Sequence, residues 1–214
     1  MISALRVFSR ALGDAWDALV LLAALNLMWL GLSLLIVFLP PATAAMFAAT
    51  HELAGGRSPG VRDFLAAVRS HFWQAWRWAL LNVAAAAIFV ASFAFYGSIR
   101  EPWADAVEGL TLLFAVLWCV SQLYVWPFLL SQAEPRLSQA LRNAVLAVLA
   151  APLFALTFAA IVALVLALSL ALIAPIAVIT TAFVCLLANH AVTDRLRAFG
   201  KLPATMAAGQ GNDG

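Results

Sequence analysis

Residues 143–189 read NAVLAVLAAPLFALTFAAIVALVLALSLALIAPIAVITTAFVCLLAN, and the thiol of Cys185 is their one ionisable side chain. A helix that crosses a bilayer needs about 20 mostly apolar residues, so this stretch is too long for a single crossing. Lipid tails offer no hydrogen-bond partners, whereas a helix satisfies its own backbone groups. The stretch therefore predicts two membrane-spanning helices, and we place the turn between them near residues 168–175.

Three further apolar runs lie upstream, at residues 16–39, 76–99 and 105–130. Pro40-Pro41 should stop the first run, because proline has no N–H to donate to the preceding turn. Over the whole chain 65% of residues are hydrophobic and 10% are charged, whereas soluble domains carry about 25% charged residues. The fold class predicted is an all-α, polytopic membrane helix bundle with about five transmembrane helices.

The first run could also be read as a cleaved signal peptide, because Ala42-Thr43-Ala44 fits the small-x-small cleavage pattern. The apolar core of a signal peptide is about 7–15 residues long, however. The run from Ala18 to Leu39 is longer than that, so we expect it to be a retained span.

Shorter segments predict interfacial amphipathic helices beside the spans. Between Val61 and Trp76 an apolar side chain recurs every fourth residue, which favours one helix along the membrane surface. A helix of small residues is expected at 42–54, followed by a turn at 55–60. We expect residues 1–193 to form one transmembrane domain and residues 194–214 to form a cytoplasmic, disordered tail.

The orientation follows from Lys and Arg, because acidic residues contribute little to it. With five crossings, nine basic residues fall on one face and three on the other. The nine are Arg57, Arg62, Arg69, Arg77, Arg136, Arg142, Arg195, Arg197 and Lys201; the three are Arg6, Arg10 and Arg100. This count predicts an N-terminus outside and a C-terminus in the cytoplasm.

Residue patterns typical of catalysis or metal binding are incomplete in this sequence. His51-Glu52 begins an H-E-x-x-H pattern, but position 55 is Gly, so the second imidazole is missing. His190 and Asp194 lie one helical turn apart and supply only two ligands, so an ordinary contact at a helix end is the better interpretation. The net charge of +2 is too small to indicate nucleic acid. We expect no enzyme, no cofactor, no metal and no nucleic-acid partner.

Four amides fall within or near the apolar runs: Asn26, Asn82, Gln122 and Asn189. Each needs a partner, since hydrocarbon offers none. The first interpretation is hydrogen bonding between helices, at roughly 0.6–2 kcal/mol each. The alternative is that Asn82 and Gln122, together with Tyr124, line a polar path.

Several motifs in the first half of the chain resemble a known family. They are Asn26-Leu27-Met28-Trp29, Pro41-Ala42-Thr43-Ala44-Ala45-Met46, Phe64 and Phe72-Trp73-Gln74-Ala75. They are similar to those of the YesL-like family of small bacterial integral membrane proteins, in which Asn-x-x-Trp precedes a Gly-Pro-Ala-x-x-Ala segment and an aromatic lead-in to the second span. The resemblance covers residues 15–90 well. Pro40 stands where the family tends to have Gly.

The resemblance implies a role, because members of that family tend to be encoded beside carbohydrate ABC transporters. It implies a non-enzymatic accessory protein of the bacterial cytoplasmic (inner) membrane, acting in carbohydrate uptake or its regulation. An ABC permease or another membrane subunit is then the expected partner, alongside the lipid bilayer. We expect contact or structural roles for Asn26, Trp29, Pro41, Thr43, Phe72 and Trp73. The alternative is a stand-alone transporter or channel for a neutral small solute.

Overall fold

The computed structural model describes residues 7–9, 11–13, 16, 18–172 and 180–198, and every regular element in these residues is a helix. The all-α class is therefore confirmed for this part of the chain. Two of its helices are long and apolar enough to cross a membrane. A third crossing is possible if a bent pair of helices counts as one span, so the structure supports two or three candidate crossings.

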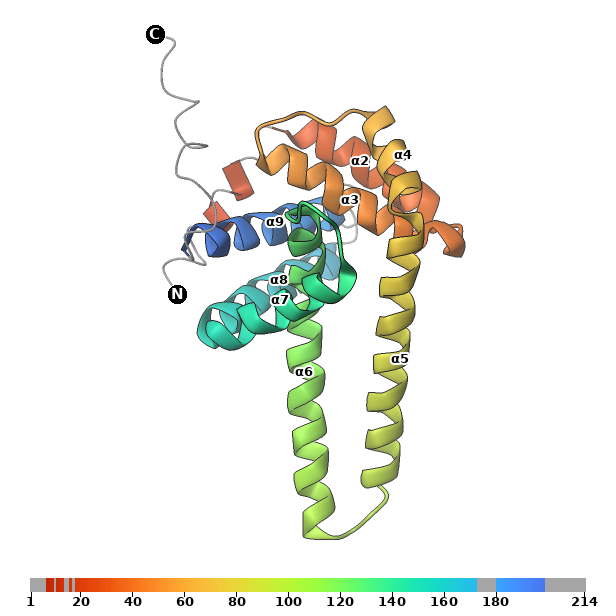
Figure 1. The fold of residues 1–214 in the computed structure, drawn as a ribbon, viewed down its shortest axis with the longest axis vertical. Coiled ribbons are helices and arrows are strands. Elements are labelled where there is room, and N and C mark those ends of the chain that lie inside the picture. The colour runs from red at the N-terminus through yellow and green to blue at the C-terminus, as the bar shows by residue number, and fades with distance from the viewer. Residues whose placement is uncertain (1–6, 10, 14–15, 17, 173–179, 199–214) are drawn as a thin grey trace.

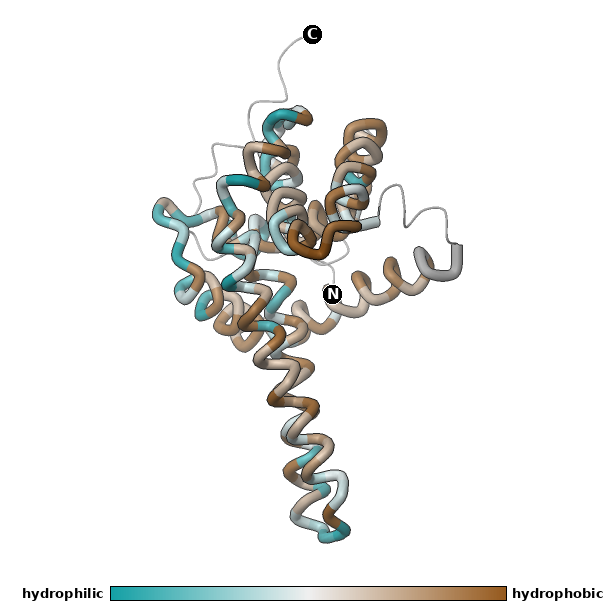
Figure 2. Tube along the Cα trace, turned by 90° about the vertical axis from the view of Figure 1, so that its right-hand side faces the viewer, coloured by the Kyte–Doolittle hydropathy of each residue, from teal (hydrophilic) through white to brown (hydrophobic). Residues whose placement is uncertain are grey.

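The two long helices are α5 (Phe72–Tyr96) and α6 (Pro102–Leu130), which confirm the apolar runs at 76–99 and 105–130 as helices. They form an antiparallel hairpin whose far end projects away from the other helices (Figure 1). Gly97 follows α5 at this end, where a Cβ would lie 2.7 Å from the Phe93 carbonyl oxygen, so the turn favours a residue without a side chain. The projecting part is largely hydrophobic along its length (Figure 2).

The remaining helices gather around the opposite end of the hairpin (Figure 1). At their centre, α3 (Leu39–Ala54) packs against α2 (Leu19–Ser33), α4 (Val61–Ser70), α5, α6 and α9 (Thr181–Ala198). Small residues let helix backbones approach closely, and most of α3 is buried, including Ala42, Ala44, Ala45 and Ala49. The predicted helix at 42–54 exists, and it lies in the packed core.

The sequence predicted that the two prolines would end the first span, and this prediction is wrong. α2 ends at Ser33, a short 3₁₀ helix, η1, covers Ile36–Phe38, and α3 begins at Leu39. Pro40 and Pro41 occupy the first turn of α3. The missing N–H has no cost there, because the first turn of a helix has no carbonyl to donate to. α3 ends at the predicted turn, where Gly56 adopts a φ of +79° that favours glycine.

The prediction of one continuous helix at 61–76 is also wrong, because two helices cover this segment. α4 ends at Ser70, and α5 begins at Phe72, so His71 separates them. The apolar repeat is therefore divided between two helices. Phe64 and Val68 are buried in the core, and Phe72 opens the membrane hairpin.

The predicted fourth span is broken near its start. α7 (Leu137–Ala150) and α8 (Pro152–Leu172) meet at a bend of 105°. Pro152 begins α8 and has no N–H for the preceding turn, so the break has a signal in the sequence that hydropathy alone overlooks. Residues 168–172 are helical, so the predicted turn does not lie there, and residues 173–175 lie outside the described part.

The first five residues of the predicted tail are helical. α9 continues to Ala198, so residues 194–198 are helical and not disordered. Residues 199–214 lie outside the described residues, as does most of the segment before residue 18. Within that N-terminal segment Phe8 packs edge-to-face against Phe183 of α9, with ring centroids 6.1 Å apart.

Candidate functional site

Two of the residues that the resemblance singles out meet between α2 and α3. The indole Nε1–H of Trp29 donates to the Thr43 hydroxyl oxygen at 3.1 Å, and that hydroxyl donates to the Leu39 carbonyl at 2.9 Å. Pro41 is buried two residues earlier in α3. Asn26 is buried where α2 meets α9, and its Oδ1 accepts from the backbone N–H of Ala182 at 3.4 Å. These contacts hold α2 onto the core.

Phe72 and Trp73 lie together on the surface at the start of α5. Their rings meet edge-to-face, with centroids 5.4 Å apart, and Phe72 meets Phe38 of η1 in the same way at 6.2 Å. A groove with a cavity volume of about 480 Å³ lies here. We call it the α4–α5 groove; it is lined by Phe38, Leu65, Val68, Arg69, Phe72 and Trp73. Trp73 is 75% exposed, so the described part of the chain leaves most of this residue uncovered.

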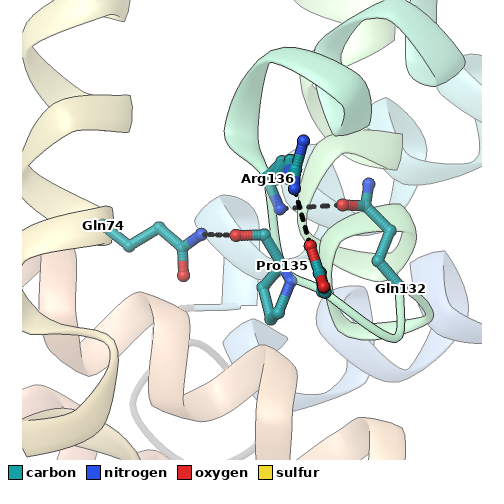
Figure 3. A network of polar contacts seen from close by, with 5 residues as sticks. Gln74, Gln132, Pro135 and Arg136 are labelled. Carbon is teal, nitrogen blue, oxygen red and sulfur yellow. Dashed lines mark hydrogen bonds and ion pairs between the residues drawn. The ribbon is translucent and has the colours of Figure 1, made fainter.

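The start of α5 is also tied to the loop that follows α6, as Figure 3 shows. The Gln74 side-chain amide donates to the Pro135 carbonyl at 3.1 Å. Within the loop, Arg136 pairs with Glu134 at 2.7 Å, and its backbone N–H donates to the Gln132 side chain at 2.9 Å. The sequence predicts two polar connectors on one face of the membrane, at residues 55–76 and 131–143, and the structure brings these two connectors into contact.

Asn82 and Gln122 bond to each other across the hairpin, at 3.2 Å from Asn82 Nδ2 to Gln122 Oε1. Two indoles complete the cluster: Trp78 donates to Gln122 Oε1 at 3.0 Å, and Trp118 donates to Asn82 Oδ1 at 3.2 Å. This confirms hydrogen bonding between helices for the two amides. The sequence did not single out the two tryptophans, although indole N–H groups are the donors that buried amide oxygens need.

Tyr124, the third residue of the predicted polar path, does not join this cluster. It is two residues from Gln122, which is about 200° around a helix. Its ring packs against Phe158 of α8 with centroids 5.5 Å apart. The structure therefore brings together two of the three residues and sends the third to the opposite side of α6.

A second polar contact lies in the core between α3 and α9. Asn189 is 1% exposed, and its Nδ2 donates to the Phe47 carbonyl and to the Thr50 hydroxyl, both at 3.1 Å. Its Oδ1 lies 3.1 Å from His51 Nδ1. An amide oxygen can only accept, so that nitrogen carries the proton. The sequence marked Asn189 as needing a partner, but it held no signal that residues of α3 would supply one.

The chemistry available at these places is recognition and packing. Within residues 18–172 and 180–198, and the few described before them, no group of three or more His, Cys, Asp or Glu side chains is placed to hold a metal ion. A further cavity of about 240 Å³ lies between α5, α6 and α7. It is lined by the apolar or aromatic side chains of Phe89, Phe114, Leu117, Trp118, Val145, Val148 and Leu149.

Comparison with known families finds one match. Residues 22–93, which span α2 to most of α5, match a family described as "Protein of unknown function, DUF624". The matched region includes the Trp29–Thr43 contact and the α4–α5 groove, and it overlaps the residues that carry the YesL-like resemblance. No curated protein and no solved structure matches the chain.

Proposed function

We propose that this chain is a non-enzymatic accessory protein of the bacterial cytoplasmic membrane that binds the permease of a carbohydrate ABC transporter. The α4–α5 groove is the observation that carries the proposal. It joins the exposed Trp73 ring and two half-buried phenylalanine rings to the guanidinium of Arg69 at the end of a membrane hairpin. Tryptophan and arginine are the residue types that most often dominate binding energy at protein interfaces.

The occupant we propose is a permease segment with an apolar anchor and an acidic side chain. The anchor would cover the Trp73 ring, and the carboxylate would pair with Arg69, which lies on the exposed face of α4. The choice of a carbohydrate transporter rests on the YesL-like resemblance and on the gene neighbourhood of that family.

The alternative of a self-contained transporter finds less support in the contacts. The amide groups of Asn82 and Gln122 hydrogen-bond to each other and to two indoles, so these bonds do not serve a passing solute. The cavity beside them is lined by apolar and aromatic side chains. A neutral, polar solute would have few partners there.

A pull-down from the native host in a gentle detergent tests the binding role. Trp73→Ala should weaken recovery of the permease subunit at least ~10-fold, because truncating a hot-spot residue typically costs about 2 kcal/mol or more. Trp103→Ala is the matched control, since this exposed tryptophan lies at the other end of the hairpin. Recovery of the wild-type protein without a permease subunit would refute the proposal, as would equal losses in both variants.

We further propose five crossings, with the N-terminus outside and the C-terminus in the cytoplasm. The nine-to-three distribution of basic residues supports this arrangement. Five crossings require α2 and α9 to span in addition to the hairpin and the bent α7–α8 pair. Three crossings would still leave both connectors in the cytoplasm, but would reverse the two termini.

Reporters fused to each terminus separate these two arrangements. A periplasmic signal at the N-terminus and a cytoplasmic signal at the C-terminus are expected for five crossings. The opposite pair of signals would establish three crossings and overturn the proposed topology. A fusion after Ser98, in the tip of the hairpin, serves as a control because both arrangements place it outside.

A further inference from the structure

The cavity of about 240 Å³ between α5, α6 and α7, which we call the hairpin cavity, opens on the outer face of the molecule. Three of its lining side chains, Phe114, Val145 and Leu149, are also exposed. The most apolar stretch of α5 beside it is not covered by protein. The hairpin cavity is therefore continuous with the apolar surface that the hairpin presents to its surroundings.

Aromatic rings indicate the depth of this cavity in the membrane, because tryptophan and tyrosine favour the two membrane–water interfaces. Tyr96 meets Trp103 edge-to-face at the tip of the hairpin, with ring centroids 6.2 Å apart, and Trp76 lies near the other end of α5. A helix rises about 1.5 Å per residue, so Trp76 and Tyr96 lie about 30 Å apart, which is the thickness of the hydrocarbon layer. Phe89 lies between them, so the hairpin cavity opens within this layer.

The lining of the hairpin cavity decides which molecules suit it. Its walls are apolar or aromatic side chains. An apolar cavity of about 150 Å³ in a protein stays dry and takes up apolar molecules. A cavity left empty loses the dispersion contacts that its walls would otherwise make. Acyl chains are the flexible apolar groups that surround a membrane helix, so an acyl chain is the occupant that this cavity fits.

Arg142 places a positive charge beside the hairpin cavity. It precedes Val145 by three residues and Leu149 by seven, so the three side chains follow one face of α7. Arg142 is exposed and lies nearer the start of α7, which follows the polar loop at 131–136. In the described part of the chain the one ion pair joins Arg136 to Glu134. The Arg142 guanidinium therefore has no carboxylate within salt-bridge distance there.

We propose that the hairpin cavity and Arg142 bind one anionic phospholipid. One acyl chain occupies the cavity, and the phosphate pairs with the Arg142 guanidinium. Guanidinium groups bind phosphate oxygens through parallel hydrogen bonds, which gives both strength and direction. The polar end of the lipid then lies near the loop at 131–136. In the orientation proposed above this loop is cytoplasmic, and anionic headgroups of the cytoplasmic leaflet attract basic residues.

Native mass spectrometry of the delipidated full chain, released from detergent micelles, tests the site with three lipids. Dioleoyl phosphatidylglycerol is anionic. Dioleoyl phosphatidylcholine carries a phosphate but no net charge, and dioleoylglycerol has the same chains without a phosphate. The wild type should retain one molecule of phosphatidylglycerol saturably, and it should bind the other two lipids more weakly.

Substitutions on α7 test the position of the acyl chain. Val145→Trp fills the hairpin cavity and should weaken binding of all three lipids at least ~10-fold, because burying as few as two methylene groups contributes a factor of that size. Leu146→Trp is the matched control, since Leu146 is exposed on the same turn but does not line the cavity. Leu149→Trp fills the cavity from a more exposed position, and it takes the place of Val145→Trp if that variant does not fold.

A second pair of variants tests the headgroup. Arg142→Gln should weaken binding of phosphatidylglycerol about 5-fold, the contribution of one basic residue near an anionic membrane surface, and should leave binding of dioleoylglycerol unchanged. Arg77→Gln is the control, because it removes an exposed charge at the same end of the hairpin. Arg77 lies about 120° around α5 from the cavity-lining Phe89.

Four outcomes overturn the proposal. The first is a wild-type protein that shows no saturable binding of phosphatidylglycerol. The second is equal affinity in the cavity-filling variant and in Leu146→Trp, and the third is equal affinity in Arg142→Gln and in Arg77→Gln. The fourth is a wild-type dimer that retains no lipid, which would show that a second copy of the chain covers the cavity.

Discussion

The helix pair α3–α9 and the hairpin α5–α6 are both built mainly from apolar residues. The surroundings of these apolar side chains differ between the two regions. In α9 the side chains from Cys185 to Asn189 are buried against protein. In the most apolar 18-residue stretch of α5, none is buried. Apolar side chains therefore serve two purposes here. The difference in their burial indicates that those of α9 pack against protein and those of α5 face lipid.

The amides follow the same division. In α3–α9 the Asn189 amide is fully enclosed and bonds to backbone and side-chain groups of the neighbouring helix. In the hairpin, Asn82 and Gln122 are half-buried and depend on each other and on indoles. The polar groups between α3 and α9 form hydrogen bonds within a core that already excludes solvent. Those in the hairpin link α5 to α6 where the side chains of α5 are little covered by protein.

The largest contrast should come from one substitution made in each region. Leu186→Ala removes a fully buried side chain of α9 and should lower the free energy of unfolding by about 2–5 kcal/mol, because a cavity remains. Leu112→Ala removes an exposed side chain of α6 and should change it by about 0.5 kcal/mol or less. Unfolding in mixed micelles with increasing dodecyl sulfate measures both. Equal changes in the free energy of unfolding would show that the two regions do not differ in this way.

A charge on the hairpin should show the next largest effect. Val83→Arg places a cation on the exposed middle of α5 and should cost about 2.5–3.5 kcal/mol of insertion free energy. Val61→Arg, at the exposed start of α4, is the control and should be nearly neutral. The fraction of protein that resists alkaline extraction from membranes reports the difference. Wild-type behaviour of Val83→Arg would show that lipid does not cover this face.

The amide cluster in the hairpin should give a smaller, coupled effect. Asn82→Leu and Gln122→Leu remove partners of the same hydrogen bond. A double-mutant cycle should therefore show an interaction energy of about 0.6–1.7 kcal/mol. The measurement is unfolding of the two single variants and the double variant in the same micelles. Additive effects would mean that the contact contributes nothing to pairing of the helices.

The smallest effect is expected where α2 joins the core. Trp29→Phe keeps the aromatic ring and removes the Nε1–H that donates to Thr43. Hydrogen bonds between membrane helices average about 0.6 kcal/mol, so a loss of that size is expected in the free energy of unfolding. Thr43→Val also removes the bond to the Leu39 carbonyl, so a double-mutant cycle of the two substitutions is needed to isolate the Trp29–Thr43 contact. A much larger loss would indicate that α2 is held by this contact more than by its apolar side chains.

The hairpin was predictable because its signals are local. Long apolar runs at 76–99 and 105–130, separated by Arg100-Glu101-Pro102, predict two helices and a turn. The need of Asn82 and Gln122 for a partner was equally clear from their apolar surroundings. The sequence did not identify Trp78 and Trp118 as their partners. Tryptophan is common at the surface of membrane helices, so these two residues did not stand out.

The predictions that failed depended on contacts between distant segments or on single prolines. Pro40 and Pro41 were read as a stop, although the same residues are suited to the first turn of a helix. Pro152 was passed over inside a long apolar run, and the bend of 105° lies there. The burial of α3 could not be read from its alanines, since a small apolar residue is compatible with lipid, with protein and with an interface.

The sequence by itself determined that this is a helical membrane protein, where its long hairpin lies and which polar groups within it need partners. Hydropathy and helix length are sums over neighbouring residues, so they need no knowledge of the rest of the chain. Only the tertiary structure decided that α3 lies in the core and that Phe38, Arg69 and Trp73 share a groove. These arrangements join residues far apart in the chain, and their positions depend on how whole helices pack.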